Sequence, residues 1–263
     1  MKILILPTVE AVTKHAARRL ARQLKRKPHS VLGLATGGTM DRLYAALPAM
    51  VAEEGAQIEQ MRSFNLDEYV GLSGDHPQSY RHYMATRFGV PLGVDLARMA
   101  LPCGDAPDPA AEAARYEAAI AEAGGIDLQL LGIGQNGHIG FNEPTSSLRS
   151  RTRIKTLTRS TVAANARYFD RPEDVPTRAI TMGIATILDA REVLLLATGA
   201  AKAEALAAAI EGPLAAASPA SALQLHPKAT VLCDEDAAAA LRLRDYYETV
   251  HPGGRDPSFG GPL

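Results

Sequence analysis

Tryptophan is absent from this chain of 263 residues, and cysteine occurs only at Cys103 and Cys233. The missing tryptophan excludes no class of protein. The two cysteines lack the close ligand spacing of a zinc site, so we expect free thiols in a reducing compartment. No apolar run approaches the roughly 20 residues that cross a bilayer, and residues 1–7 carry no signal-peptide cleavage pattern. These features favour a cytoplasmic protein.

An excess of charge of either sign is also lacking. Lys and Arg total 28, Asp and Glu total 29, and the net charge is −1. Nucleic acids and membrane surfaces normally require a basic face, so we expect neither as a partner. The hydrophobic fraction of 46% is typical of a globular protein with a sizeable core.

Short apolar runs alternate with segments of helical period. Strands are expected at residues 1–6, 30–35, 62–66, 126–133, 192–198 and 230–233. Helices are expected at 9–27, around 43–50, and at 79–88, 111–123, 201–210 and 236–248. This alternation predicts the α/β class: a three-layer, Rossmann-like, doubly wound and mostly parallel sheet with helices on both faces. We expect one domain over residues 1–250 and a flexible Gly- and Pro-rich tail over 251–263.

Loops that follow strands of such a sheet are where ligands bind, and residues 34–39 form the first informative one. A strand there enters Thr36-Gly37-Gly38-Thr39 and then a helix, so several backbone N–H groups point at one place. That arrangement suits a phosphate, although a plain tight turn with a Thr cap explains it as well. The P-loop and dinucleotide fingerprints are both incomplete here.

Two further loops carry titratable side chains. Asp67 and Glu68 follow a strand, and only one of them can face a given site because side chains alternate. One is a candidate for proton transfer, whereas a helix cap or a salt-bridged loop is the structural alternative. In residues 131–144 four glycines surround His138, with Asn136 and Glu143 close by. A histidine oriented by an amide and a carboxylate is suited to proton transfer near neutral pH.

The fourth loop, residues 198–202, ends at Lys202 between a strand and a helix. A lysine there can meet a phosphate attracted by the helix end, or it can simply face solvent.

Together these loops resemble the glucosamine-6-phosphate deaminase/isomerase family. The matching segments are TGGT (36–39), FNLDEYVGL (64–72), GHIGFNEP (137–144), SRTRIKTL (150–157) and LQLHPKA (223–229). They occur in the family's order and spacing across almost the whole chain. The resemblance implies conversion of glucosamine 6-phosphate and water to fructose 6-phosphate and ammonia, with no cofactor and no metal.

The resemblance also implies a role for each candidate residue. Asp67 is the expected base that moves a proton between C1 and C2, and His138 the group that opens the sugar ring. Asn136 and Glu143 are expected to orient or polarise that histidine. The implied phosphate and substrate contacts are Thr36, Gly37, Gly38, Thr39, Arg167 and Lys202.

Some members of the family are hexamers that N-acetylglucosamine 6-phosphate activates at a subunit interface. The residues that match this allosteric site are Ser146, Arg153, Lys155 and Thr156, with Tyr246 or Tyr247 as the tyrosine near the C-terminus. The resemblance therefore implies a homo-oligomer and this activator. The alternative is that the basic segment merely belongs to the fold.

Three other functions are alternatives. A 6-phosphogluconolactonase-like hydrolase shares a Gly-His loop, but it does not account for the segments around Asp67 and Glu143. A deaminase/isomerase for the galactosamine epimer is excluded less firmly. A non-catalytic sugar-phosphate sensor would usually carry a DNA-binding segment and lack Asp67 or His138, so the catalytic function is favoured.

Overall fold

A computed structural model describes residues 1–166, 169 and 171–256 of the chain. Its main sheet has seven strands in the order β1-β10-β9-β6-β2-β3-β5, and every neighbouring pair is parallel. These strands are β1 (Lys2–Leu6), β2 (Val31–Leu34), β3 (Arg62–Asn65), β5 (Met99–Ala100), β6 (Leu128–Gly132), β9 (Val193–Ala197) and β10 (Ala229–Asp234). The doubly wound parallel sheet expected from the sequence is therefore confirmed.

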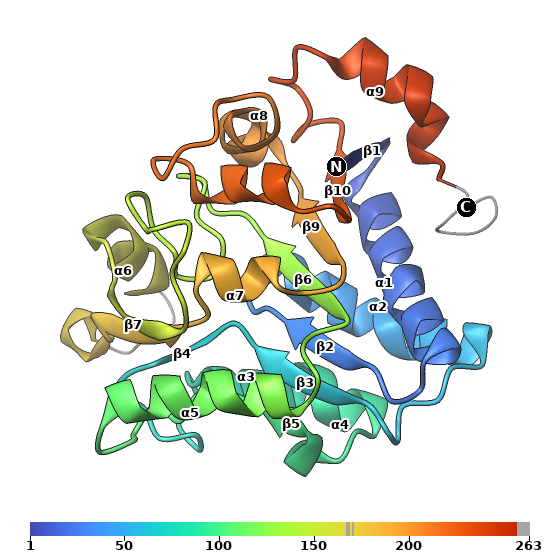
Figure 1. Ribbon diagram of the computed structural model, residues 1–263. Coiled ribbons are helices and arrows are strands. Elements are labelled where there is room, and N and C mark those ends of the chain that lie inside the picture. The colour runs from blue at the N-terminus through green and yellow to red at the C-terminus, as the bar shows by residue number, and fades with distance from the viewer. Residues whose placement is uncertain (167–168, 170, 257–263) are drawn as a thin grey trace.

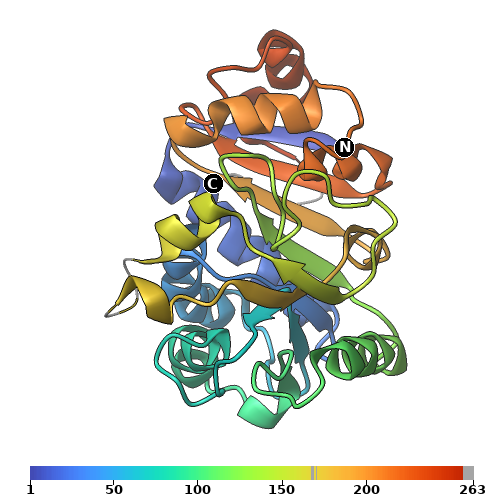
Figure 2. The same ribbon diagram turned by 90° about the vertical axis from the view of Figure 1, so that its left-hand side faces the viewer.

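Helices cover both faces of this sheet. The α-helices are α1 (Val9–Arg26), α2 (Gly38–Glu54), α3 (Tyr80–Met84), α4 (Val90–Leu92), α5 (Pro109–Glu122), α6 (Arg159–Asn165), α7 (Ile184–Leu188), α8 (Ala203–Ile210) and α9 (Arg244–Val250). In the two perpendicular views α1 and α2 lie on one face, and α5 and α7 lie on the other (Figure 1, Figure 2). Within the described residues no helix combines the length and the hydropathy that a membrane span requires.

The sequence explains these elements locally. In α1 the Thr8 side chain accepts a hydrogen bond from the Ala11 N–H, which caps the helix. The apolar side chains of α1 recur every four residues and are all buried against the sheet: Val12, Ala16, Leu20 and Leu24. Strand β9 is buried along its whole length, as a central parallel strand covered on both faces should be.

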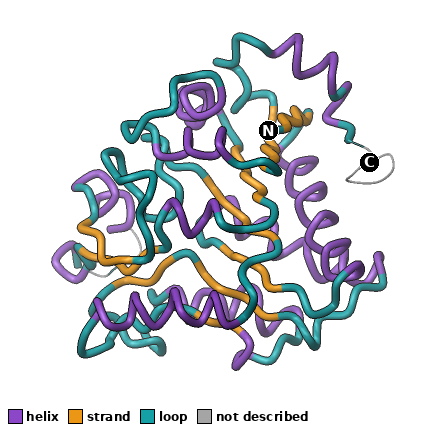
Figure 3. Tube along the Cα trace, viewed as in Figure 1, coloured by secondary structure: helices purple, strands orange, loops and turns teal. Residues whose placement is uncertain are grey.

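A second, smaller sheet was not predicted. It contains β4 (Asp67–Tyr69), β8 (Arg178–Thr181) and β7 (Arg153–Thr156) in the order β4-β8-β7, with antiparallel pairing. Leu66 joins the two sheets, because its N–H donates to the Leu34 carbonyl and its carbonyl accepts from the Met182 N–H. These strands have three or four residues and lack the apolar run that predicts the equally short β2, so no local pattern marks them in the sequence. Figure 3 shows the short strands of the second sheet beside the main one.

The last predicted helix is wrong over its first half. Residues 236–240 form turns, and the helix begins only at Arg244. The Glu211 carboxylate accepts the backbone N–H groups of Arg242 and Leu243, so these donors cannot continue a helix from Asp236.

The helix predicted at 79–88 is α-helical only over Tyr80–Met84, and it continues as a π-helix over Ala85–Gly89. Further along, residues 251–256, the first part of the expected tail, pack against β1, where Asp256 is buried and forms an ion pair with Lys2.

The turn between the small sheet and α7 leads to a stability prediction. A Cβ atom added at Gly183 would lie 2.0 Å from the Ser150 carbonyl oxygen, which is backbone and has little freedom to move. Gly183→Ala should therefore lower the free energy of unfolding by about 1–3 kcal/mol. Gly38→Ala is the matched control, because a Cβ there meets nothing within 4 Å. Equal denaturation midpoints for the two variants would contradict the prediction.

Candidate active site

The candidate site lies where the order of the main sheet reverses. Strands β2 and β6 are neighbours, and the chain proceeds from β2 toward β5 but from β6 toward β9 and β10. The carboxyl ends of two such strands diverge into loops that leave a crevice between them. Residues 36–39 follow β2, the loop of His138 follows β6 and Lys202 follows β9, whereas Asp67 lies on β4, which follows β3 (Figure 1).

The first loop presents the start of α2. Gly37 precedes this helix with φ of 112°, a conformation that favours glycine. Gly37 and Gly38 are exposed, while Thr36 and Thr39 are half-buried beside them. Because the first N–H groups of a helix have no intrahelical acceptor, this end of α2 can accept an anion. The strand-turn-helix geometry is thus present, and the phosphate contact stays a prediction.

Lys202 stands at the end of the 3₁₀ turn Ala200–Lys202, directly after β9. The preceding turn is anchored by Asp234, whose two carboxylate oxygens both accept the Gly199 N–H at 3.0 Å. Burial lowers the pKa of Lys202, and no carboxylate in the described part of the chain offsets this effect. A half-buried ammonium without such a partner is a suitable partner for an anionic ligand.

Asp67 opens β4 and is buried. It pairs with Thr181 of β8, whose hydroxyl lies 3.5 Å from Asp67 Oδ2. The glycine-rich loop passes directly over the carboxyl group, since a Cβ atom at Gly140 would lie 3.3 Å from Oδ2. Burial and then the charge of Glu68 raise the pKa of Asp67 to about 7, although the Phe141 N–H and Thr181 oppose the shift. A carboxyl group with this pKa can both take and return a proton near neutral pH.

Glu68 does not share the site of Asp67, as the alternation of side chains predicted. Its carboxylate accepts the backbone N–H groups of Tyr69, Tyr80 and Arg81, each at 2.9 Å. Burial raises the pKa of Glu68, and these three donors oppose that shift. Glu68 therefore holds the first turn of α3 while Asp67 faces the glycine-rich loop.

His138, Asn136 and Glu143 form one hydrogen-bonded line. His138 Nδ1 lies 2.7 Å from Asn136 Oδ1, and Asn136 Nδ2 donates to Glu143 Oε2 at 2.7 Å. The imidazole lies against Gly134, where a Cβ atom would come within 2.2 Å of the ring. Glycine is therefore required at position 134 for the ring to occupy this place.

The ionisation state of Glu143 determines the direction of the hydrogen bonds that join Glu143, Asn136 and His138. Burial alone would raise the pKa of Glu143, but hydrogen bonds from His138, Thr161 and Asn136 lower it to about 2. An ionised carboxylate only accepts, so Asn136 must turn its NH₂ group to Glu143 and its oxygen to His138. Nδ1 of His138 must then carry a hydrogen, which leaves Nε2 as the nitrogen that can exchange a proton with a ligand.

Several side chains of the site were missed in the sequence. The Thr158 hydroxyl donates to Glu143 Oε1 at 3.2 Å, and the Thr161 hydroxyl donates to the same oxygen. Thr181 supports Asp67 from β8. These threonines lie in the chain segment that runs from β7 through α6 to β8, which is separate from the glycine-rich loop in the sequence. No local pattern marks a threonine whose only distinction is its tertiary partner.

The residues expected at an allosteric site are only partly brought together. Arg153 and Lys155 lie on one face of β7, and Thr156 lies on the other because strand side chains alternate. Arg153 donates to Asn142 Oδ1 at 2.9 Å, which connects β7 to the glycine-rich loop. Ser146 is buried, and its hydroxyl has no hydrogen-bond partner among the described residues.

The tyrosine expected at the allosteric site is not found in this arrangement. Tyr246 and Tyr247 lie on α9, which is distant in space from β7 of the same chain (Figure 1). Arg167 lies outside the residues that the structure describes.

Across residues 1–166, 169 and 171–256, no three His, Cys, Asp or Glu side chains are grouped closely enough to hold a metal ion.

Comparison with known proteins identifies the family. The model of glucosamine-6-phosphate isomerases/6-phosphogluconolactonase matches residues 7–232, and the chain belongs to this family. Glucosamine-6-phosphate deaminase of Shewanella loihica is 54% identical over 250 residues, which cover 95% of this chain and 93% of that protein. The deaminase of Streptomyces coelicolor is 51% identical over 262 residues, covering 99% of this chain and 100% of that protein.

The solved structures agree with the fold. A monomeric glucosamine-6-phosphate deaminase, 47% identical, superposes with a TM-score of 0.88 over 91% of this chain and 100% of that one. The 6-phosphogluconolactonase of Trypanosoma cruzi is 19% identical, with a TM-score of 0.72 over 92% of this chain and 97% of that one. At that identity the second likeness concerns the fold alone.

The raised pKa of Asp67 makes stability depend on pH. The native state binds this proton more tightly than an unfolded chain, whose Asp has a pKa of about 3.9. The contribution of Asp67 to stability is therefore lost as pH rises from about 4 through 7. Asp67→Asn should be the more stable protein at pH 8, by up to about 4 kcal/mol, and the gain should shrink toward pH 4. Denaturation of both proteins across this range is the measurement, and a difference independent of pH would contradict the assignment.

Proposed function

We propose that the protein is a glucosamine-6-phosphate deaminase, which converts glucosamine 6-phosphate and water to fructose 6-phosphate and ammonia. The observation that carries this proposal is the buried Asp67 carboxyl, with a pKa of about 7, beneath the loop that carries His138. A proton shuttle between neighbouring carbons needs such a group. Relatives that carry this name and share about half of the residues support the same conclusion.

The first step is opening of the sugar ring. His138 Nε2 takes the proton of the C1 hydroxyl and passes it to the ring oxygen as the bond between C1 and that oxygen breaks, because its Nδ1 is occupied by Asn136. Glu143 and Asn136 keep the imidazole in this orientation through the step. The product of the step is the open-chain aldehyde, in which the carbon beside the carbonyl is acidic enough to lose a proton.

The second step moves a proton between carbons. The Asp67 carboxylate removes the proton from C2, and the oxygen on C1 takes a proton from the substrate's ammonium group, which gives a neutral enolamine. The same Asp67 carboxyl then returns its proton to C1. The result is an imine at C2, which water hydrolyses to the ketone with release of ammonia. The buried surroundings of Asp67 keep its pKa high enough for it to hold the proton between the two transfers.

The phosphate is held at the other end of the substrate. The N–H groups at the start of α2, the hydroxyls of Thr36 and Thr39, and Lys202 form the proposed phosphate site. Arg167 is proposed to assist, as the family resemblance implies. A held phosphate orients the sugar chain toward Asp67 and reduces the entropic cost of reaching the reactive geometry.

The test of the function is release of ammonia and fructose 6-phosphate by the purified protein. Glucosamine 6-phosphate is the expected substrate, with galactosamine 6-phosphate and 6-phosphogluconolactone assayed in parallel. Asp67→Asn should lower kcat/KM by about 10²-fold or more, since it removes the base. Stoichiometric release from glucosamine 6-phosphate supports the proposal. Turnover of galactosamine 6-phosphate or 6-phosphogluconolactone instead would contradict the proposal and identify the substrate.

The pH profile tests the role of Asp67 separately. The base must be ionised in the free enzyme, so kcat/KM should fall on the acid side with a limb centred near pH 7. Asp67→Asn should lack this limb in its residual activity. An acid limb near pH 4 in the wild type would show that another group is the base.

Regulation and assembly are proposals of finer detail. The proposed binding site for N-acetylglucosamine 6-phosphate consists of Ser146, Arg153, Lys155 and Thr156. The hydrogen bond from Arg153 to Asn142 couples this site to the glycine-rich loop. A homo-oligomer stays a prediction from the resemblance, and a cytoplasmic location stays a prediction from the composition of the sequence. The solved relative that is 47% identical is a monomer, so the mass in solution is the decisive measurement.

Activation has its own test. The N-acetyl sugar should lower the substrate concentration needed for half-maximal rate, and Arg153→Ala should abolish that response. Saturation curves that coincide with and without the N-acetyl sugar would contradict the proposal.

A further inference from the structure

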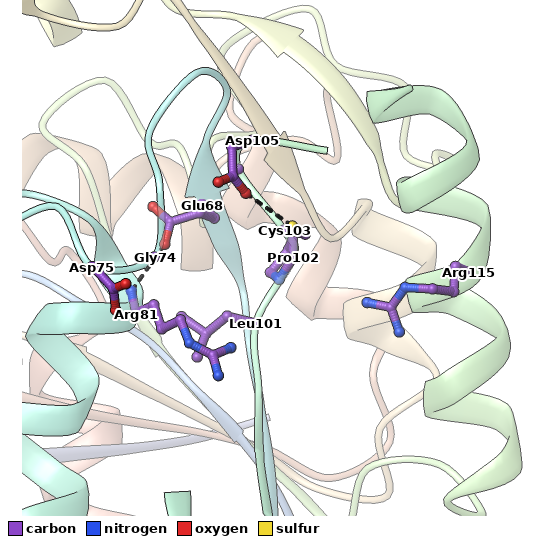
Figure 4. A pocket seen from close by; sticks show the side chains of 10 residues that line it. Glu68, Gly74, Asp75, Arg81, Leu101, Pro102, Cys103, Asp105 and Arg115 are labelled. Carbon is purple, nitrogen blue, oxygen red and sulfur yellow. Dashed lines mark hydrogen bonds between the residues drawn. The ribbon is translucent and has the colours of Figure 1, made fainter. Parts of the chain in front are cut away.

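Helix α3 is held at its first turn by a side chain from β4. Glu68 Oε1 accepts the Tyr69 and Tyr80 N–H groups, and Oε2 accepts the Arg81 N–H. Figure 4 shows Glu68 reaching from the strand toward Arg81, with the latter bond dashed. The residue before Glu68 is Asp67, so one short strand carries the proposed base and the anchor of α3.

The same helix touches the proposed phosphate loop. The Tyr83 hydroxyl donates to the Gly37 carbonyl at 3.4 Å. The Tyr80 hydroxyl faces the Thr36 side chain and donates to the Tyr69 hydroxyl at 3.2 Å. Helix α3 therefore bridges β4 and the residues at the start of α2.

Tyr80 also meets the glycine-rich loop. Its ring stacks on Phe141 with the ring centroids 6.0 Å apart and the planes inclined by 13°. The backbone N–H of Phe141 interacts with the Asp67 carboxyl as a hydrogen-bond donor and lowers its pKa. A displacement of the first turn of α3 would therefore move the residues at the start of α2 and the glycine-rich loop, which lie at the two ends of the proposed substrate site.

From this chain of contacts we infer that Glu68 is a positioning residue that sets the phosphate loop at a fixed distance from Asp67. The inference deepens the proposed function and rests on it for the identity of the substrate. Glu68 does not touch the reacting atoms; it acts through Tyr80 and Tyr83.

The contacts around Glu68 leave little room for another group in place of its carboxylate. Three backbone N–H donors converge on its two oxygens, and an amide would turn an NH₂ group toward at least one of them. The other side of Glu68 is closed by Gly104, where a Cβ atom would lie 3.2 Å from Glu68 Cγ. The charge of Glu68 acts on the Asp67 carboxyl, and the charge of Arg81 acts on the Glu68 carboxyl.

Glu68→Gln is the principal test, measured by calorimetric titration with inorganic phosphate and by steady-state kinetics. Binding of phosphate should weaken about tenfold, and KM for glucosamine 6-phosphate should rise by a similar factor, with a smaller change in kcat. The acid limb of kcat/KM should also move to lower pH, because the charge of Glu68 contributes to the raised pKa of Asp67. A helix cap without this role would change the melting temperature and leave phosphate binding and KM unchanged.

Glu112→Gln is the matched control. Glu112 is likewise buried and accepts a backbone N–H, that of Cys103 at 2.8 Å, but it has no contact with α3 or the phosphate loop. Its substitution should alter stability and leave phosphate binding unchanged. Tyr83→Phe removes only the hydroxyl that contacts Gly37, so it serves as the second variant if Glu68→Gln does not fold.

The outcomes separate the two proposals. Unchanged phosphate binding and KM in Glu68→Gln, or in Tyr83→Phe if the former does not fold, would overturn the inference and leave the deaminase intact. A wild-type protein that binds phosphate but releases no ammonia would overturn the proposed function. Weakened phosphate binding in Glu68→Gln would still support the positioning role in that case.

Discussion

The burial of one carboxyl group at the junction of two sheets organises this molecule. Asp67 follows directly after Leu66, which is hydrogen-bonded to β2 on one side and to Met182 on the other. The chain thus leaves the main sheet and enters the small one at the residue before the carboxyl group. Thr181 and the loop at Gly140 then close over Asp67 from two directions. A charge in that position is costly, so the proton becomes easy to gain and to release near neutral pH.

Two buried carboxyl groups of the site are held in opposite states by their partners. Asp67 has few donors and a neighbouring negative charge, and its pKa is raised to about 7. Glu143 receives hydrogen bonds from His138, Thr161 and Asn136, and its pKa is lowered to about 2. One group is therefore equipped to transfer protons, and the other remains an anion that orients its neighbours. This division follows from the count of donors and not from the residue types.

The family shares its fold more widely than its chemistry. A lactonase with 19% identity superposes with a TM-score of 0.72, so the doubly wound sheet alone does not distinguish a deaminase from a hydrolase. The proposed distinction lies in groups at the carboxyl edge of the sheet: Asp67 on β4 and Glu143 in the loop after β6. The small antiparallel sheet supplies Thr181 to this edge and brings β7 beside it.

The sequence by itself determined the layered fold and most of the candidate site. Apolar runs separated by helical periods predict the main sheet, because each parallel strand and each amphipathic helix carries its burial pattern locally. Glycine-rich turns after those strands predict that the loops of Gly37 and His138 lie at the same edge of the sheet, since the carboxyl ends of parallel strands share one edge.

Only the tertiary structure decided the rest. The start of α9 depends on Glu211 from another helix, and the small sheet depends on strands too short to show a period. The support of Asp67 by Thr181 and of Glu143 by Thr161 spans 114 and 18 residues of sequence. The pKa of Asp67 likewise comes from what surrounds it, because burial and donor count are properties of packing that no local pattern encodes.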